Sequence, residues 1–558
     1  MAPGNETRIL FVPYRPSPAA EQPSERSEIS LQKHAAREYH RKAKVARLAK
    51  AYTGSNAQPP HQRKALGKPP EQVTRLLSQA DEREAWRRNA PSQRIPGTNT
   101  FRIRTAAAAN LQSPTDVGVG KVDPFNVLIR QNTPQYVQEM LDYAVSYQWP
   151  VFSCSMAAGA ISEIKHTVLA SAMRSQAAFY TIVFAGAAHN AFAHTGMAIT
   201  RENKILRLTY KTHAIKALNN EISSLKGYVS DELLLCMVML GAHGSGDTLS
   251  PRPSRTNESS LLTAQNFHFY GHMHWETAHW DAVKHMVQQR GGLHTVRLDY
   301  LSNIIALTDL IAALKSVSAP SYPLRVSTAR LMCFWPYTKR EAVRPLLHNL
   351  GTGFQDLSPV VLDDQLTRTV ATICEISKGY DLYMHKDKSA PELIVIIWGR
   401  NCLIHDLLSL PDKSSDPLNP DSCVYEVCRL ATLAYMLLVL FPFPRVSGMH
   451  YTLAQRLMLI LNTCWTFGLQ QEHRELFLWA TMLGGILSQN TALRVWFTEE
   501  LRLPAQQAQK SWSSIKHVCA RFLWFEQDCD APGEELWTEV SRTSKLQPMF
   551  LPGGNTGA

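Results

Sequence analysis

The stretch from Thr133 to Pro150 reads T-P-Q-Y-V-Q-E-M-L-D-Y-A-V-S-Y-Q-W-P and decides the fold class. Thr133 is a residue type that caps helices, and the proline after it suits the first helical position, where no backbone N–H is needed. Apolar residues then recur at helical spacing, at Val137, Met140, Leu141, Ala144 and Val145. The spacing predicts an amphipathic helix that ends before Pro150.

The chain beyond residue 123 repeats this pattern of long apolar-periodic segments between short Pro or Gly breaks. A second helix should end at Gly291–Gly292, with Trp280, Val283 and Val287 on one face and Arg290 in its last turn. Further helices are predicted around residues 155–190, 228–242, 300–316, 364–380, 392–409, 423–441, 451–468, 474–488 and 508–526. Because period-two alternation is rare, we expect an all-α fold, an array of helical hairpins that forms one large domain over residues 120–545.

Residues 1–119 have a different composition, rich in Pro, Ser, Gln and Arg and poor in aromatic residues. Such a segment buries too little apolar surface to offset the entropy of ordering, so we expect a largely disordered basic arm with one helix near residues 25–52. Residues 1–110 hold 20 of the 58 basic and 9 of the 47 acidic side chains, which leaves 38 of each for the remainder. The whole formal net charge of +11 therefore belongs to the arm. Residues 546–558 are predicted to be a disordered tail.

Basic side chains of the arm follow one side of its predicted helix. The candidate nucleic-acid-binding residues are Lys33, Arg37, Arg41, Lys42, Lys44 and Arg47, most of them at helical spacing. Such a stripe can lie along a phosphate backbone, which would bind DNA in a salt-dependent way. It is equally typical of a solvated basic face or of a nuclear-import signal. No leucine heptad follows, so a dimeric basic zipper is not expected.

Membrane, secretory and disulfide-linked classes find no support in the sequence. The only early apolar run, Ile9 to Val12, is far shorter than a signal core, so we expect an intracellular protein. The longest apolar candidate, Leu430 to Phe441, is interrupted by Thr432 and stopped by Pro442, so it predicts a buried helix and no membrane partner. The ten cysteines form no C-x-x-C pair, which argues against structural zinc and disulfides.

Motifs for catalysis and metal binding are incomplete. A histidine-rich segment includes an H-x-E, but the P-C-x-x-C that would complete a zinc deaminase is missing, as is H-E-x-x-H. Neither a phosphate-binding loop nor a nucleophile elbow has its glycines in frame. We therefore predict no catalytic residues, no metal site and no cofactor, with His279 packed on the helix that leads to the double glycine. The histidines are His268, His272, His274, His279 and His285.

Several segments together resemble the fungal-specific transcription factor domain, the helical regulatory region of zinc-cluster regulators. They begin with D-P-F at Asp123, Pro124 and Phe125, and with V-Q-Q-R-G-G-L, which includes Arg290, Gly291 and Gly292, followed by Asp309. The C-terminal segments are Leu478–Trp479 with Gly484–Gly485, Trp496–Phe497, Ser511–Trp512, Phe522–Leu523–Trp524 and Leu536–Trp537. The arm adds Phe11–Val12 and H-A-A-R-E-Y-H-R at residues 34–41.

The resemblance implies structural roles for these residues and no catalytic ones. Gly291 and Gly292 would stop a helix, Trp512 and Trp524 would anchor the core, and Asp309 would pair with Arg290. A zinc binuclear cluster needs six cysteines before the helical domain, but the first cysteine here is Cys154. The chain therefore resembles the branch that lacks this DNA-reading module.

The resemblance also implies a function. We expect a nuclear transcriptional regulator of a fungus, with ties to secondary-metabolite gene expression. Its helical domain would bind other regulators or a small-molecule effector, and its basic arm would give nuclear import or weak DNA contact. Two alternatives remain open, a nuclear interaction protein that never touches DNA and an unrecognised enzyme.

Overall fold

The part of the chain that the structure describes is built from helices. The computed structural model describes residues 133–153, 158–193, 201–225, 227, 229–244, 259–333, 335, 343–359, 361–416, 418–508 and 511–545. Of this part 76% is helical, and it contains no strand. The predicted all-α fold class is confirmed. The arm at residues 1–119 and the tail at residues 546–558 lie outside the described residues.

Eighteen α-helices follow one another along the described residues, joined by short turns and single turns of 3₁₀-helix. They are α3 (Gln135–Tyr143), α4 (Ala158–Arg174), α5 (Gln176–Ala193), α6 (Arg201–Ser223), α7 (Asp231–Ala242), α8 (Ser260–Thr263), α9 (Phe267–Tyr270), α10 (Thr277–Gln289), α11 (Asp299–Ser316), α12 (Thr328–Met332), α13 (Asp364–Met384), α14 (Leu393–Ser409), α15 (Pro420–Leu438), α16 (Met449–Thr466), α17 (Arg474–Leu487), α18 (Leu493–Ala508), α19 (Trp512–Arg521) and α20 (Glu526–Lys545).

The helix predicted over residues 133–150 is present, but it begins and ends differently. Its N-cap is Pro134 and not Thr133, and the Pro134 carbonyl accepts from the Val137 and Gln138 amides at 3.0 and 3.3 Å. After α3 the helix widens into a π-helical turn, η2 (Ala144–Gln148), which the 3₁₀ turn η3 (Pro150–Phe152) follows. π-Helical turns are rare in proteins, and those that occur are frequently found at functional sites.

Helix α5 is the centre of the first half of the described chain. It is buried on every side and packs against α3, α4, α6 and α7. A single helix was predicted over residues 155–190, but the structure divides it into α4 and α5 at Ser175. The Ser175 side chain accepts from the Ala178 amide at 3.1 Å and donates to Glu221 at 2.8 Å, so it starts α5 as a cap.

Helix α15 has the same central place in the second half, because it is buried on every side and packs against α14, α16 and α17. The helix predicted over residues 508–526 is wrong in its bounds: α18 ends at Ala508, Ser511 caps α19, and α20 begins at Glu526. Aromatic residues close this end of the core. The Trp479 ring stacks on Phe522, with the centroids 5.2 Å apart, and its N–H donates to the Leu523 carbonyl at 2.8 Å.

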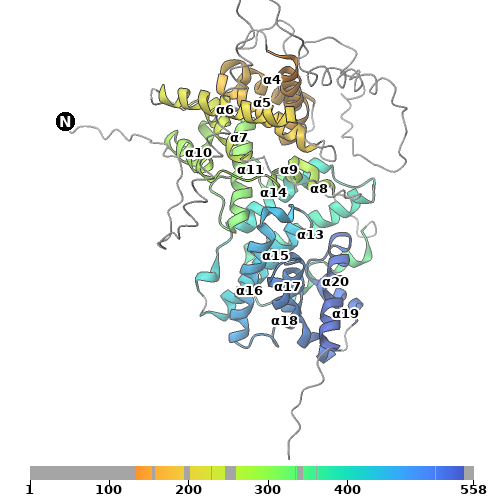
Figure 1. Cartoon of the computed structure of the whole chain (residues 1–558). Helices are drawn as coiled ribbons and strands as arrows, with labels where there is room; N and C mark the ends of the chain where they lie inside the picture. The colour runs from red at the N-terminus through yellow and green to blue at the C-terminus, as the bar shows by residue number, and fades with distance from the viewer. Residues whose placement is uncertain are drawn as a thin grey trace, which may run out of the picture. The chain divides into compact units, whose positions relative to one another are not determined.

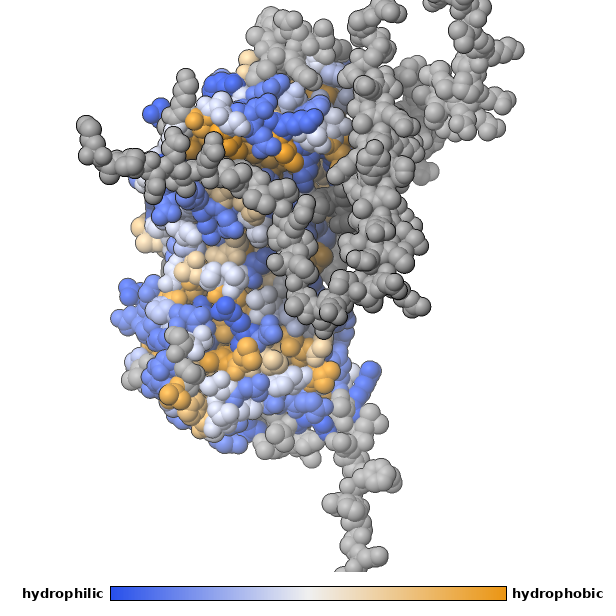
Figure 2. Space-filling view, turned by 60° about the vertical axis from the view of Figure 1, so that its left-hand side comes forward, coloured by the Kyte–Doolittle hydropathy of each residue, from blue (hydrophilic) through white to orange (hydrophobic). Residues whose placement is uncertain are grey.

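Helix α11 connects the two groups. It packs against α7 from the first half and against α14 and α16 from the second, and Figure 1 shows it between the helices around α5 and those around α15. In Figure 2 hydrophilic side chains cover most of the visible face, and hydrophobic ones gather in patches near the top and in the lower half. Among the described helices, none combines the length and the apolar character needed to cross a bilayer.

Candidate ligand-binding cavity

Two adjoining hollows lie beside α11, where it meets both halves of the fold. The large hollow has a volume of about 30 Å³, and the small hollow has a volume of about 20 Å³. They share Tyr270, Trp275 and Ile311 as lining residues. Most of the other walls are aliphatic or aromatic, and each hollow has room for about one or two water molecules.

The large hollow is lined by one face of α7, one face of α11 and the segment between α8 and α10. The α11 residues are four apart or fewer, so they lie along one face of the helix. Its lining residues are Phe152, Val238, Met239, Ala242, Gln265, Phe267, Tyr270, Trp275, Ile304, Leu307, Thr308 and Ile311.

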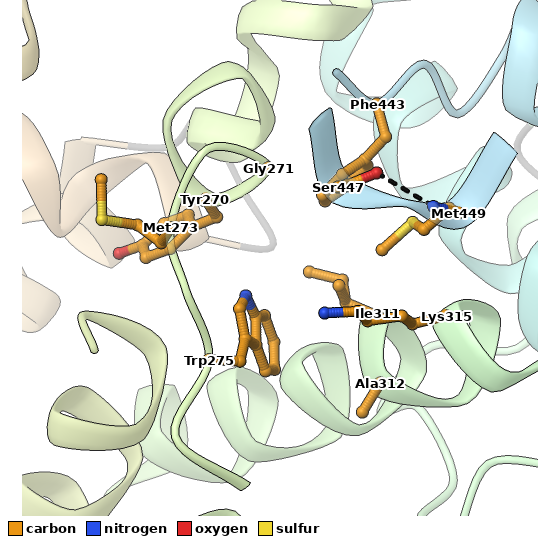
Figure 3. Close-up of a pocket in the computed structure, with 10 residues that line it drawn as sticks. All are labelled: Tyr270, Gly271, Met273, Trp275, Ile311, Ala312, Lys315, Phe443, Ser447 and Met449. Atoms are coloured by element: carbon orange, nitrogen blue, oxygen red, sulfur yellow. Dashed lines mark hydrogen bonds between the residues drawn. The ribbon is translucent and has the colours of Figure 1, made fainter. Parts of the chain in front are cut away.

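The small hollow opens between α11 and the start of α16. In Figure 3 the Trp275 indole nitrogen and the Lys315 ammonium both point into the space between the labelled residues. Opposite them lie Ser447 and Met449, which are joined by a hydrogen bond of 3.4 Å from the Met449 amide to the Ser447 hydroxyl. Within the part of the chain that the structure describes, no carboxylate pairs with Lys315.

The wall of the large hollow contains two consecutive residues in the left-handed conformation. Gln265 has φ 54° and ψ 23°, and Asn266 has φ 58° and ψ 30°. Left-handed backbone costs a non-glycine residue on the order of 1–2 kcal/mol, although asparagine tolerates it better than most. The turn brings the Gln265 side chain to the hollow, where it is 2% exposed. Among the described residues, its Nε2 has no hydrogen-bond partner.

Helix α14 holds this strained turn from behind. The fully buried Arg400 donates to the carbonyls of Leu261 at 2.5 Å and of Ala264 at 3.4 Å, and its guanidinium lies 4.3 Å from the centroid of the Phe267 ring. Burial lowers the pKa of Arg400 to about 9. The next residue, Asn401, donates to Gln265 Oε1 at 3.1 Å, whereas among the described residues the buried Gln265 Nε2 has no partner. The strain persists because these neighbours hold the turn.

A chain of buried polar groups connects the π-helical turn to the cavity wall. His243 Nδ1 lies 2.8 Å from the Met239 carbonyl, so this nitrogen must donate. Burial lowers the pKa of His243 to about 4, so the ring is neutral and its Nε2 accepts from Gln148 Nε2 at 3.3 Å. Gln148 also donates to the Tyr270 hydroxyl at 3.5 Å. The lining residue Tyr270 is therefore positioned by a side chain that the π-helical turn presents.

The segment that carries Trp275 is fixed against the end of α7. The Glu276 amide donates to the Gly241 carbonyl at 3.0 Å, and Lys211 Nζ donates to the Gly244 carbonyl at 2.6 Å. A Cβ at Gly244 would lie 1.8 Å from the His274 carbonyl oxygen, so only glycine allows this approach. The lack of a side chain at Gly244 thus sets the place of Trp275.

The predicted site residues of the arm, Lys33, Arg37, Arg41, Lys42, Lys44 and Arg47, lie outside the described residues, as do Asp123, Pro124 and Phe125. The double glycine ends α10, which finishes at Gln289. Gly291 and Gly292 have φ of 96° and 122°, and their amides donate to the Gln288 and Val287 carbonyls at 2.9 Å each. These bonds form a Schellman motif, in which glycine supplies the left-handed residue.

The expected pairing of Asp309 with Arg290 is wrong. Arg290 instead donates to Asp231 at 2.6 Å, and both side chains are buried. Asp309 accepts from the Ser321 and Tyr322 amides at 2.5 and 3.0 Å, so it fixes the loop after α11. Asp231 is the first residue of α7, where a carboxylate also suits the helix dipole.

The two tryptophans expected to anchor the core lie together. Trp524 is completely buried and donates to Asp530 at 2.8 Å, whereas Trp512 is only half-buried. Their rings meet edge to face at 6.1 Å. A Cβ at Gly533 would come within 2.7 Å of the Trp512 ring, so α20 packs closely against the pair. All four positions are distant in sequence from the residues that line the cavity.

The histidine-rich segment surrounds part of the cavity and does not form a metal site. Among the described residues, no group of three His, Cys, Asp or Glu side chains could hold a metal ion. His279 packs on α10 near Gly241, and burial lowers its pKa. His268 and His272 lie against the Phe192 ring at 5.5 Å each. The nine cysteines that the structure describes are all free.

Comparisons of the chain with protein-family models, with curated proteins and with solved structures find no match. The resemblance to the fungal-specific transcription factor domain therefore stays a prediction. No motif or spacing in the sequence pointed to Gln148, His243 or Arg400 as parts of a site. The segment 264–275 did carry one signal. Its aromatic residues do not follow helical spacing, and no Pro or Gly adjoins Gln265 to explain the break.

Proposed function

We propose that the protein is a regulator of transcription whose helical region binds other regulators or a small effector, with the wall of α11 and the turn at Gln265 as a candidate contact. The observation that carries the ligand-binding part is the buried Gln265 amide, which a strained turn holds at an otherwise apolar wall. The transcriptional part rests on the basic arm and on the family resemblance. Nuclear import and weak DNA contact are the roles proposed for the arm.

Binding is favoured over catalysis because of the residues that line the hollows. Among the described residues that line the hollows there is no Asp, Glu, His or Cys, and Lys315 is the one charged side chain. General acid–base chemistry needs a titratable group in contact with the substrate, and nucleophilic chemistry needs an activated nucleophile. We therefore propose no enzymatic activity for this cavity.

The experiment that tests the proposal combines chromatin occupancy with transcript profiling, in strains that carry the wild-type chain, a deletion or Ala242→Phe. Ala242 lines the large hollow, so a phenyl group there would fill it. We expect the deletion and the filled variant to change an overlapping set of transcripts. If the wild-type chain occupies no chromatin and its deletion changes no transcript, the regulatory proposal is wrong.

A second candidate is an interaction protein that does not touch DNA. Large hydrophobic side chains exposed on neighbouring helices favour it: Tyr451 and Leu459 of α16 and Val495 of α18 are 45%, 56% and 66% exposed. Reversing the charges of Lys33, Arg37 and Arg41 in the full chain separates the two. Lost occupancy with nuclear entry retained supports DNA contact, and a log–log salt slope of about −4 to −5 would fit five or so phosphates. Unchanged occupancy supports recruitment by other proteins.

A further inference from the structure

Tyrosine side chains form an exposed strip along α3 and the π-helical turn that follows it. Tyr136 and Tyr147 are 50% and 58% exposed, and Met140 and Tyr143 lie between them and are half-buried. Because the four residues are four, three and four positions apart, they lie along one side of the helix. The rings of Tyr143 and Tyr147 are in contact, with their centroids 5.4 Å apart. These four residues make up the tyrosine face.

The core holds the tyrosine face in place from behind. Val137 and Leu141 of α3 are completely buried. The Tyr143 hydroxyl lies 2.9 Å from Nδ1 of the buried His189 on α5, so this ring has a fixed place. Tyrosine offers a large contact area and loses little conformational entropy on binding, and it is enriched at protein interfaces. The face is therefore a preformed docking surface.

The charges around the tyrosine face disfavour a second copy of the chain as its occupant. Glu139 and Asp142 are the only charged residues between Gln135 and Gln148, and both are acidic. In a symmetric pair of copies the same surface faces itself, so the four carboxylates would meet at one interface. Like charges brought together in this way oppose binding. The face instead suits an apolar segment whose charge is positive.

The chain directly before α3 has this composition. Residues 125–130 read F-N-V-L-I-R, with apolar residues at every second position, Phe125, Val127 and Ile129, and with Arg130 as the only charge. In an extended segment these three apolar side chains share one side. Five extended residues span about 16 Å, and the helical rise from Tyr136 to Tyr147 is also about 16 Å.

The connection to α3 keeps this segment close to the tyrosine face. The entry of the chain into α3 is fixed, because Thr133 is buried and its carbonyl accepts from Gln138 Nε2 at 3.1 Å. Residues 131–133 alone separate the segment from Pro134, the N-cap of α3. So short a tether gives the segment a high effective concentration at the face, which a separate molecule does not have.

We propose that residues 125–130 bind along the tyrosine face as an extended segment, with Phe125, Val127 and Ile129 against the tyrosine rings. The basic arm then leaves the helical domain at residue 124 and not at residue 132. This docking does not depend on the proposed regulatory function, but it sets the length of chain over which the basic stripe of the arm is tethered.

Hydrogen–deuterium exchange of the full chain, followed by mass spectrometry, tests the proposal. We expect the amides of residues 125–130 to exchange about tenfold more slowly than those of a free peptide with the same sequence, because docking shields them. The double variant Tyr136→Ser, Tyr147→Ser should remove most of this protection. The control Tyr451→Ser, at a tyrosine of α16 that is 45% exposed, should keep it. Exchange as fast as in the free peptide would overturn the proposal, and so would protection that survives the double variant.

Variants of the segment show which of its sides makes the contact. Phe125→Ser combined with Ile129→Ser should speed exchange of the segment about tenfold. Asn126→Ser, on the opposite side of an extended segment, should leave the rate within about twofold. Equal effects of the two changes would contradict the extended arrangement. Slow exchange in the buried helix α15 shows for every variant that the fold is intact and that the loss of protection is local.

The molar mass from light scattering distinguishes the segment from a second copy as the occupant. We expect the wild type and the double variant Tyr136→Ser, Tyr147→Ser to have the same mass. If the wild type is a dimer and the double variant a monomer, the tyrosine face is an interface between copies and the proposal is wrong.

Discussion

Acid should destabilise the protein through His243, whose burial sets the size of the effect. The pKa of this imidazole falls from about 6.5 in an unfolded chain to about 4 in the fold, chiefly because the ring is fully buried. Between these values the unfolded chain binds more protons than the folded one, so stability falls as the pH drops through this window. At pH 5 the difference amounts to about 2 kcal/mol, and above pH 7 it vanishes.

The surroundings of the ring support this direction. The bond to the Met239 carbonyl favours the protonated form, but the nearby His189 and Lys211 disfavour it and burial dominates. Protonation would also place a hydrogen on Nε2, which now accepts from Gln148. The polar chain behind Tyr270 would then break, so acid should loosen the cavity wall as well as the fold.

Urea unfolding of the wild type and of His243→Asn at pH 7.5 and pH 5 measures the effect. The variant removes the titrating group, so its loss of stability between the two pH values should be about 2 kcal/mol smaller than that of the wild type. The exposed His285 provides the matched control, and His285→Asn should lose as much as the wild type. Equal losses in the wild type and in His243→Asn would refute the argument that a neutral, buried imidazole is required.

The remaining predictions concern the fold and the small hollow. Lys386→Gly should stabilise the protein by about 1 kcal/mol, measured by urea unfolding, because this exposed residue has φ 57° after α13 and glycine adopts that conformation without strain. Gly271→Ala, in the wall of the small hollow, should cost about 1–3 kcal/mol in urea unfolding, since its Cβ would lie 2.3 Å from Pro444; an unchanged free energy of unfolding would contradict this close approach. Asp231→Asn should cost about 3 kcal/mol, because the buried Arg290 would lose its carboxylate, and a cost below 1 kcal/mol would contradict the pairing.

Much of the fold follows from local signals in the sequence. The double glycine predicted the end of α10, and the apolar spacing predicted the positions of α7, α11, α13, α14, α16 and α17. The prediction failed where one side chain decides a boundary. Ser175 divides the helix predicted over residues 155–190 because its hydroxyl caps α5 and bonds Glu221 of a distant helix. Helix α20 was missed because Pro532 lies inside it.

The cavity could not be predicted in this way, since its parts are distant in sequence and each looks ordinary alone. The α11 face of Ile304, Leu307 and Ile311 has the spacing of any core helix. Gln265 and Arg400 are common surface residue types, and only tertiary packing buries them together. The histidines of the same segment attracted attention as metal ligands, but their neighbours are aromatic rings.

Two separate energetic costs coincide at the turn formed by Gln265 and Asn266. The left-handed turn at Gln265 and Asn266 costs on the order of 1 kcal/mol or more for each residue. The buried guanidinium of Arg400, which among the described residues has carbonyls and rings but no carboxylate around it, adds a desolvation penalty. An aliphatic core could close the same space without either cost. Arg400 and Asn401 stabilise the turn, and among the described residues this arrangement leaves Gln265 Nε2, Asn266 Nδ2, Arg400 Nε and Asn401 Oδ1 without a hydrogen-bond partner.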